Sequence, residues 1–370
     1  MLLMIPGPVQ LHERIIKAMC RQMIYHRGEE FAEIMKYCVR ALKPIFGLKD
    51  GTISIISGSG TAGVEAAIAS FGKIRKILTI ENGKFGERIR EIAEKYYETE
   101  KLKFEWGKSI DLGEVEKKMK GCDAVAFVHN ETSTGILNPA KEIAKIAKEH
   151  DALVIVDAIT SAGGDYLKMD DWGIDVAITG TQKCLGAPPG LAIVAVKDEA
   201  WKYYNARNYY LDLGSYRKKL SELQTPFTPA IPLFLALAEA LKIIEEEGLE
   251  NRIKRHRTLN LAVRKWAVEA GLELFPEIDE YSSYSNTLTA IKIPNGITDS
   301  QLRNTLKKEY GIMISGGQDR VKGKIFRIAA MGNVGKFEVL STLVAVEDVM
   351  RRFVKIKSSI EIAAETLRAL

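Results

Sequence analysis

Short apolar runs alternate with amphipathic stretches from about residue 51 to about residue 196. The apolar runs are typical of strands buried on both faces, and the stretches between them have the spacing of helices. The predicted strands are 52–56, 76–80, 124–128, 153–156, 176–179 and 192–196, and the predicted helices are 61–71, 85–96 and 140–150. This alternation predicts a mostly parallel sheet with helices on both faces.

A different pattern flanks this central part. The first eight residues end in Pro-Gly-Pro and predict an extended arm or turn, and helical periodicity then runs over 12–46. Further elements are predicted towards the C-terminus: helices at 233–247, 249–270, 299–310 and from 336, and strands at 287–293, 313–315 and 325–329. Gly248 is a plausible helix stop. We therefore predict three parts: an N-terminal arm (1–15), a large domain (16–247) and a small C-terminal α+β domain (248–370).

Composition narrows the class of protein. The chain has 370 residues, a net charge of +5 and 46% hydrophobic residues, which is ordinary for a globular enzyme. No basic block predicts a nucleic-acid partner, and no apolar run is long enough to predict a membrane span. The chain has four scattered cysteines, which form no CxxC pair and no cluster with histidine: Cys20, Cys38, Cys122 and Cys184. We expect reduced thiols, no metal site and a cytoplasmic location.

Two residues stand at the ends of strand-like runs, as one cofactor requires. Asp157 closes the run 153–156, and Lys183 follows the run 176–179. Pyridoxal phosphate needs a lysine amine to hold its aldehyde and a carboxylate beside its ring nitrogen. The carboxyl ends of parallel strands meet at one sheet edge, where ligands bind. If Lys183 stood alone, a solvated lysine at a strand end would be the preferred explanation, and Asp157 alone would have a similar one, as an acid that caps a turn.

Other segments reach the same edge. The turn 57–63, Ser-Gly-Ser-Gly-Thr-Ala-Gly, follows a strand and opens a helix, which is a phosphate-cradle pattern. The loop 129–135 supplies hydroxyl side chains, and Phe85 has a ring suited to stacking on an aromatic cofactor. Arg327 lies within an apolar run. It either forms an internal ion pair or grips a substrate carboxylate, and the residues alone leave both open.

The longer motifs together resemble one family. They are Ser-Gly-Ser-Gly-Thr-Ala-Gly-Val-Glu-Ala from residue 57, Glu-Thr-Ser-Thr-Gly-Ile-Leu-Asn-Pro from 131, Val-Asp at 156–157 with Gly-Thr-Gln-Lys at 180–183 and Ala-Pro-Pro-Gly from 187, and Lys-Gly-Lys-Ile-Phe-Arg-Ile from 322. The chain resembles the class V aminotransferases, and within them the branch of alanine–glyoxylate and serine–pyruvate aminotransferases. The resemblance covers essentially the whole chain. It implies the α/β fold of type I pyridoxal-phosphate enzymes, with a mostly parallel seven-stranded sheet.

The resemblance also implies roles for residues at matching positions. Lys183 is similar to the Schiff-base lysine that moves the substrate proton, and Asp157 to the partner of the ring nitrogen. The other residues that the resemblance assigns to the cofactor are Ser59, Gly60, Thr61 and Gln182 at the phosphate, Phe85 and Ile159 on the two ring faces, Thr132 near the ring hydroxyl, and Thr228 at the phosphate of a neighbouring subunit. The residues assigned to the substrate are Gly7, Arg27 and Arg327. The family often has tryptophan where this chain has Phe85.

The implied activity is a ping-pong transamination in a homodimer with shared sites. A small amino acid (alanine, serine or aspartate) would give its amino group to glyoxylate, pyruvate or 2-oxoglutarate. Arg27 or Arg320 would favour a dicarboxylate if either reaches the substrate, and Arg27 is the better candidate, although a surface charge is the preferred explanation of both.

Two alternatives remain. One is a cysteine desulfurase-like lyase, which needs a reactive thiol in the C-terminal part, whereas the last cysteine is Cys184. The other is a non-catalytic protein that binds pyridoxal phosphate.

Overall fold

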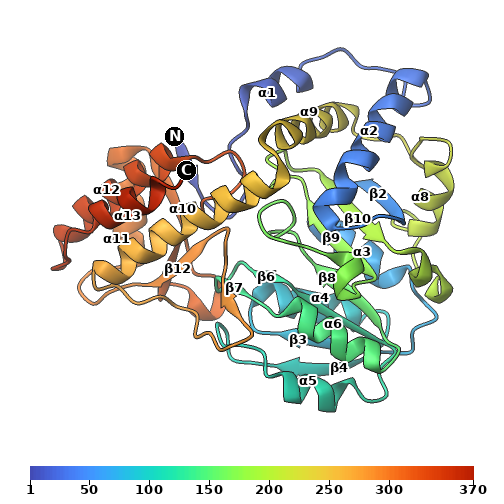
Figure 1. The fold of residues 1–370 in the computed structure, drawn as a ribbon, viewed down its shortest axis with the longest axis horizontal. Helices are drawn as coiled ribbons and strands as arrows, with labels where there is room; N and C mark the ends of the chain where they lie inside the picture. Colours follow the sequence, from blue (N-terminus) through green and yellow to red (C-terminus); the bar gives the residue numbers. More distant parts are fainter.

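The computed structural model describes all 370 residues and contains a seven-stranded sheet in the order β2-β10-β9-β8-β5-β3-β4 (Figure 1). The strands are β2 (Thr52–Ser57), β3 (Lys76–Glu81), β4 (Glu98–Lys103), β5 (Ala124–Val128), β8 (Leu153–Asp157), β9 (Val176–Gly180) and β10 (Leu191–Val196). Strand β10 runs antiparallel to both of its neighbours, and every other pair is parallel. The predicted mostly parallel sheet is confirmed.

The pattern of apolar runs did not predict β4, the last strand of this sheet. Its sequence is Glu-Thr-Glu-Lys-Leu-Lys, and only Leu102 is buried. An edge strand has one neighbour, and charged side chains protect its open edge from pairing with another chain. The strand therefore lacks the apolar run by which the other six are recognised.

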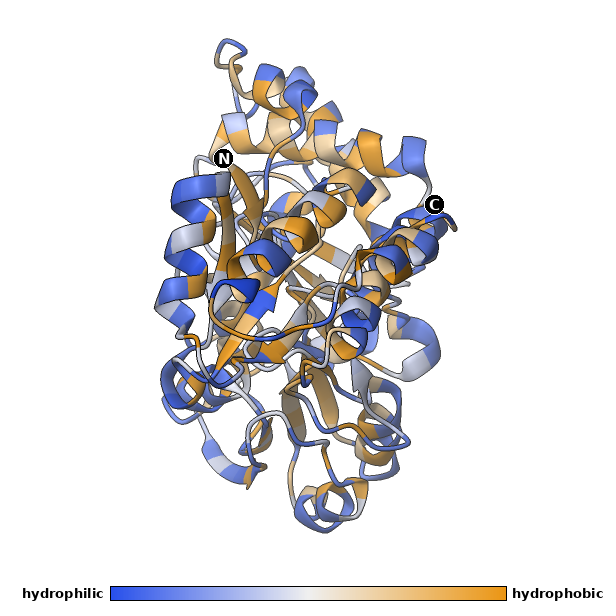
Figure 2. Ribbon diagram, turned by 90° about the vertical axis from the view of Figure 1, so that its left-hand side faces the viewer, coloured by the Kyte–Doolittle hydropathy of each residue, from blue (hydrophilic) through white to orange (hydrophobic).

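Helices cover both faces of the sheet. Those on one face are α2 (Glu29–Phe46), α5 (Leu112–Met119), α6 (Ala140–Glu149), α7 (Met169–Trp172) and α9 (Ile231–Glu247). Those on the other are α3 (Gly60–Ala69), α4 (Lys84–Ala93) and α8 (Leu213–Leu220). Successive residues of a strand enter opposite cores: Val154 and Val156 of β8 pack on the α2 side, and Leu153 and Ile155 on the α3 side. Figure 2 shows these strands as hydrophobic ribbons among helices with hydrophilic stretches.

The helical periodicity over 12–46 corresponds to two helices instead of one continuous element. Helix α1 (Glu13–Met19) ends before Cys20, and α2 begins only after Gly28. Gly28 is the N-cap of α2 and has an extended backbone, with φ of −90° and ψ of 167°. A residue in that conformation cannot continue a helix, so the chain must start a new one there.

The C-terminal part has its own sheet, in the order β1-β13-β14-β12. Its elements are β1 (Leu2–Met4), α10 (Leu249–Glu269), β12 (Thr289–Lys292), α11 (Asp299–Thr305), a π-helical turn (Leu306–Tyr310), β13 (Ile312–Gly316), a 3₁₀ turn (Asp319–Val321), β14 (Ile325–Ile328), α12 (Lys336–Arg351) and α13 (Ile360–Leu367). The predicted extended arm forms β1, which pairs in parallel with β13, so both termini lie in this part (Figure 1). The predicted domain boundaries stay predictions.

Smaller elements connect the two parts. A three-stranded sheet joins β11 (Ser283–Tyr284), β7 (Ile136–Leu137) and β6 (Asn130–Glu131), and a 3₁₀ helix (Asp198–Tyr203) follows β10. Helices α9 and α10 meet at Gly248, whose φ of 79° favours glycine. None of the helices has both the length and the apolar character needed to cross a membrane.

Candidate active site

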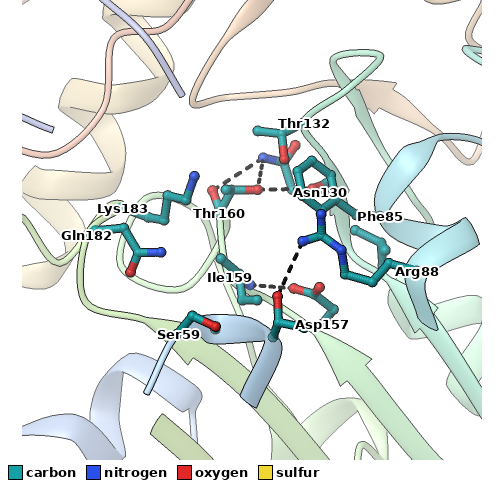
Figure 3. A pocket seen from close by; sticks show the side chains of 13 residues that line it. Ser59, Phe85, Arg88, Asn130, Thr132, Asp157, Ile159, Thr160, Gln182 and Lys183 are labelled. Carbon is teal, nitrogen blue, oxygen red and sulfur yellow. Dashed lines mark hydrogen bonds between the residues drawn. The ribbon is translucent and has the colours of Figure 1, made fainter. Parts of the chain in front are cut away.

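A cavity opens where β5, β8 and β9 end and where α3 and α4 begin (Figure 3). It is lined by Ser59, Gly60, Thr61, Phe85, Arg88, Val128, Asn130, Thr132, Asp157, Ile159, Thr160, Gln182 and Lys183. Figure 3 shows Lys183 and Gln182 on one side and Phe85 and Arg88 on the other. Nine of the ten residues predicted to bind the cofactor lie here. Their individual roles stay predictions.

Asp157 is the last residue of β8, and its carboxyl lies at the wall of the cavity. Its Oδ1 accepts a hydrogen bond from the Ile159 N–H (2.9 Å). The pKa of Asp157 is raised to about 7, mainly by burial; the hydrogen bond from Ile159 opposes this rise, and the nearby Glu131 contributes to it. A buried carboxylate needs a cationic partner to be stable in its charged form.

Lys183 follows β9 in a turn, and its amine lies in the same cavity. Burial lowers the pKa of Lys183 to about 8, against the opposing effects of Cys184 and Asp157. At neutral pH about a tenth of such an amine is uncharged and nucleophilic, far more than for an ordinary lysine.

The N-terminal segment covers Lys183. The Nζ of Lys183 donates a hydrogen bond to the carbonyl of Pro6 in this segment. Gly7 has a φ of +97°, and a Cβ there would lie 2.7 Å from Lys183 Cδ. Only glycine therefore lets this segment approach the lysine so closely. The segment 6–7 comes from the arm and closes one side of the amine.

The start of α3 provides open backbone donors. Ser59 is the N-cap of α3, and its side chain makes no capping hydrogen bond. The N–H groups of Gly60 and Thr61 lie in the first turn, where a helix offers no internal acceptor. A Cβ on Gly60 would lie 2.7 Å from Ile159 Cδ1, so the glycine allows Ile159 to pack against this turn. The arrangement suits an anion such as a phosphate.

Arg88 of α4 was not predicted, and it adds a cation beside this turn. Its Nη1 donates to Thr61 Oγ1 (3.3 Å), and its guanidinium lies 5.0 Å from the ring centre of Phe85. The signal was present in the sequence, because Arg88 follows Phe85 by three residues and the two therefore share a helix face.

Glu131 fixes the start of α4 and with it Phe85. Its buried carboxyl accepts hydrogen bonds from the N–H groups of Phe85 and Gly86 (3.0 Å each). Burial raises the pKa of Glu131. Phe85 and Ile159 are the apolar residues that face the cavity from α4 and from the end of β8.

Asn130 was also missed as an individual residue. Its Nδ2 donates to Thr160 and Thr287, whereas its buried Oδ1 has no partner. Gln182 Oε1 is likewise buried and unpartnered. Two orphaned acceptors lining one cavity indicate that a ligand with hydrogen-bond donors completes the site. No group of three or more His, Cys, Asp or Glu side chains is placed to hold a metal ion.

Arg327 lies in β14 of the C-terminal sheet and does not line the cavity itself, but it contacts Thr132, which does. It is 5% exposed, and its Nη1 donates to the carbonyl of Thr132 (2.7 Å). Its Nε and Nη2 donate to the carbonyl of Gly316 (3.0 and 2.7 Å). Burial lowers its pKa to about 10. Its hydrogen-bond partners are carbonyls, so no internal ion pair neutralises it.

Four predicted site residues do not line the cavity: Gly7 and Arg327, described above, and Arg27 and Thr228. Arg27 is exposed, and its Nη1 donates to Gln224 Oε1 (2.7 Å). Thr228 is also exposed, although the next segment is tied to the strand before the phosphate turn, because the Ala230 N–H donates to Ser57 Oγ (3.1 Å). Their assignments stay predictions.

The comparisons with known proteins agree with this geometry. The family model for class V aminotransferases matches residues 10–340. An uncharacterised aminotransferase of Methanocaldococcus jannaschii is 42% identical over 99% of this chain and 97% of its own length. Serine–glyoxylate aminotransferase of Arabidopsis thaliana is 33% identical over 94% of this chain and 90% of its own length.

A solved structure has the same fold over nearly the full length. The ureidoglycine–glyoxylate aminotransferase of Bacillus subtilis superposes with a TM-score of 0.91 at 32% identity, covering 99% of this chain and 97% of that one. Shared sequence motifs, the sheet and the family model therefore lead to one conclusion: this chain is an aminotransferase and belongs to class V.

Proposed function

We propose that the chain binds pyridoxal phosphate in this cavity and transfers an amino group from a small amino acid (alanine, serine or aspartate) to a 2-oxo acid by a ping-pong mechanism. The observation that carries the proposal is the pair of Lys183 and Asp157 in one cavity, with burial lowering the pKa of the amine to about 8. Both relatives named above that have a substrate in their names use glyoxylate, so glyoxylate is the acceptor to test first.

The lining residues fit this cofactor in several independent ways. The first turn of α3 and Arg88 would hold the phosphate, and Phe85 and Ile159 would contact the two faces of the ring. Asp157 would pair with the protonated ring nitrogen, which supplies the missing cation beside a buried carboxyl. The bound cofactor supplies an electron sink for the carbanion formed at the substrate α-carbon.

Lys183 would perform the proton transfers. Its Nζ would hold the cofactor's aldehyde covalently and, once displaced by the substrate amine, take the proton from the α-carbon. A lysine with an ordinary pKa near 10.4 would be almost fully protonated at neutral pH and unable to accept that proton. Burial between the 6–7 segment and the sheet therefore prepares the base.

Arg327 would bind the substrate's α-carboxylate. A guanidinium that is buried among carbonyls retains its charge and has N–H groups left for a carboxylate. The contact of Arg327 with the carbonyl of Thr132, a residue that lines the cavity, supports this assignment.

A homodimer would bring Thr228 and Arg27 to the cavity of the partner subunit. Both are exposed in one chain, and large apolar side chains on the same surface segments are exposed too, namely Met23, Tyr25, Tyr209 and Tyr210. Exposed apolar clusters on a globular chain mark surfaces that associate.

The lyase alternative is disfavoured by the buried state of the last cysteine. Cys184 is fully buried, and burial raises the pKa of its thiol to about 12. A sulfur-abstracting enzyme needs an accessible thiolate. Membership of class V, with named relatives that are aminotransferases, disfavours a binding protein without catalysis.

Single-turnover half-reactions test the proposal. Purified chain loaded with pyridoxal phosphate is mixed in turn with alanine, serine and aspartate, and the absorbance of the bound cofactor is followed. We expect at least one donor to convert the cofactor to its amine form, and glyoxylate to reverse the change. Lys183→Ala should lose the lysine-bound absorbance and at least about 10²- to 10⁴-fold in rate, the range for a general base. Cofactor binding without conversion by any donor would favour the non-catalytic alternative.

A further inference from the structure

In the turn that carries Lys183, three successive carbonyls accept backbone N–H groups and the next one does not. The carbonyl of Thr181 accepts the Ala187 N–H (3.0 Å), that of Gln182 the Val9 N–H (3.2 Å), and that of Lys183 the Gly186 N–H (2.9 Å). The carbonyl of Cys184 has no backbone donor. Cys184 is fully buried, and a buried carbonyl needs a hydrogen-bond donor.

Arg252 of α10 supplies that partner. Its Nε and Nη2 both donate to the Cys184 carbonyl, at 3.1 and 2.6 Å. The side chain is 1% exposed, and its Nη1 donates to Glu247 Oε2 (2.7 Å), the last residue of α9. The guanidinium is therefore fixed at both ends, by a carboxylate on one side and by the lysine turn on the other.

The same helix turn also holds the segment on the other side of the lysine turn. Arg255, bound to Glu247, donates to the carbonyls of Gly332 (3.0 Å) and Val334 (2.6 Å). The Gly332 N–H donates to His256 Nε2 (3.0 Å). A Cβ on Gly332 would lie 3.2 Å from the carbonyl O of Lys183, so this segment packs directly on the lysine turn.

We infer that Arg252 is a positioning residue for Lys183: its fork on the Cys184 carbonyl keeps the turn closed, so that the amine stays in its buried position. The inference rests on the proposed role of Lys183 as the reactive amine. Arg252 does not line the cavity, and in this inference it does not touch substrate or cofactor. It acts through the backbone of the residue next to the lysine.

The consequence is a measurable change in the amine. Burial is the largest cause of the low pKa of Lys183. If the turn loosens, water reaches Nζ and the pKa of Lys183 rises towards the ordinary value near 10.4. A purely structural role for Arg252 predicts a lower melting temperature with an unchanged pKa of Lys183 in the chains that remain folded.

The test compares Arg252→Lys and Arg252→Met with Lys254→Met in the full chain without cofactor. Arg252→Lys retains the charge and loses the fork, whereas Lys254 is exposed on the same helix and makes no hydrogen bond or ion pair. The lysines are methylated with formaldehyde and cyanoborohydride at pH values between 6 and 10. The rate at which Lys183 is methylated is measured by mass spectrometry of the peptide that contains it. Circular dichroism melting identifies the variants and conditions in which the chain is folded.

We expect the methylation rate of Lys183 to be half-maximal near pH 8 in the chain without substitutions and in Lys254→Met. For Arg252→Lys we expect this midpoint about one pH unit higher, which makes the rate at pH 7 about tenfold lower. Arg252→Met should shift it at least as far. A folded Arg252→Lys chain with the original pH profile overturns the inference, even if Arg252→Met fails to fold.

A second readout separates this inference from the proposed function. The four chains are titrated with pyridoxal phosphate, and the pH dependence of the absorbance of the lysine-bound cofactor is recorded. If the unmodified chain gives no such absorbance, the proposed function fails, while the modification profiles still test Arg252. If it does, and Arg252→Lys titrates at the same pH as the unmodified chain, the inference alone fails.

Discussion

The seven-stranded sheet and the C-terminal four-stranded sheet contribute to the cavity in different ways. The larger sheet presents its reactive groups at or just after strand ends, with Asp157 closing β8 and Lys183 following β9. The C-terminal sheet contributes no lining residue, and its Arg327, within β14, lies behind the wall and donates to the carbonyl of Thr132. Strand β14 has a neighbour on each side, because it pairs with both β12 and β13.

This difference in position implies a difference in task. Groups at strand ends border turns, where the backbone can bend around a cofactor and where small movements alter reactivity. A guanidinium in mid-strand is held by the ladder on both sides, which suits a fixed grip on a carboxylate common to all substrates. We therefore expect substitutions at the larger sheet to alter the cofactor and the chemistry, and substitutions at β14 to alter substrate binding alone.

Among substitutions that keep Lys183, the largest effect is expected for Asp157→Asn. The amide cannot keep the ring nitrogen protonated, so turnover should fall on the order of 10²- to 10³-fold, the size seen when one preorganised electrostatic group is removed. Steady-state rates with the best donor, and the absorbance of the bound cofactor, check this. If turnover stays within a factor of three of the original, Asp157 does not keep the ring nitrogen protonated, and the proposed division of tasks between the two sheets is wrong.

The same substitution should have the opposite effect on stability in the cofactor-free chain. Burial raises the pKa of Asp157 to about 7, above its value near 3.9 in an unfolded chain. Such a group favours folding fully below about pH 4, and this contribution is lost as the pH rises through about 7. Asp157→Asn should therefore match the original near pH 4 and be more stable at pH 8 by up to about 4 kcal/mol, from about three pKa units. Urea unfolding at both pH values measures the difference.

A smaller effect, confined to binding, is expected for Arg327→Lys. The lysine keeps the charge but loses the fork, which should lower kcat/KM about 10- to 100-fold through a higher KM, the range for losing a charge-assisted hydrogen bond. The absorbance of the bound cofactor should not change. Arg264→Lys is the matched control, because Arg264 also donates to a carbonyl, that of Ser285, and burial also lowers its pKa to about 10. A changed cofactor spectrum in Arg327→Lys would contradict the separation of tasks.

The sequence revealed the larger sheet's contribution well and the C-terminal one poorly. Buried parallel strands have continuous apolar runs, so Asp157 and Lys183 could be placed at their ends from the pattern alone. β4 was missed because an edge strand of charged residues has no such run, and β1 because three residues carry too little periodicity. Arg327 was recognised as unusual, but whether it forms an ion pair or binds a ligand depends on residues far away in sequence.

The residues that support the site were the hardest to predict. Arg88 and Asn130 matter through contacts with Thr61 and Thr160, which are 27 and 30 residues away in sequence. Arg252 reaches Cys184 across 68 residues. No local pattern encodes such pairs, because helix and strand periodicity report only which face is buried.

The smallest expected effect concerns Phe85, which faces the cavity from the α4 side of the larger sheet. Phe85→Trp introduces the residue that is common in the family and enlarges the stacking surface, which should tighten cofactor binding about 2- to 10-fold, from about 0.5–1.5 kcal/mol of aromatic contact. Phe85→Leu removes the stacking and should weaken binding by a similar factor. Titration of cofactor-free chain with pyridoxal phosphate measures both. Since the Phe85 N–H is fixed by Glu131, either ring starts from the same backbone position. Equal affinities for all three side chains would mean that this wall does not contact the ring, and that the cofactor is held by the phosphate turn and Asp157 alone.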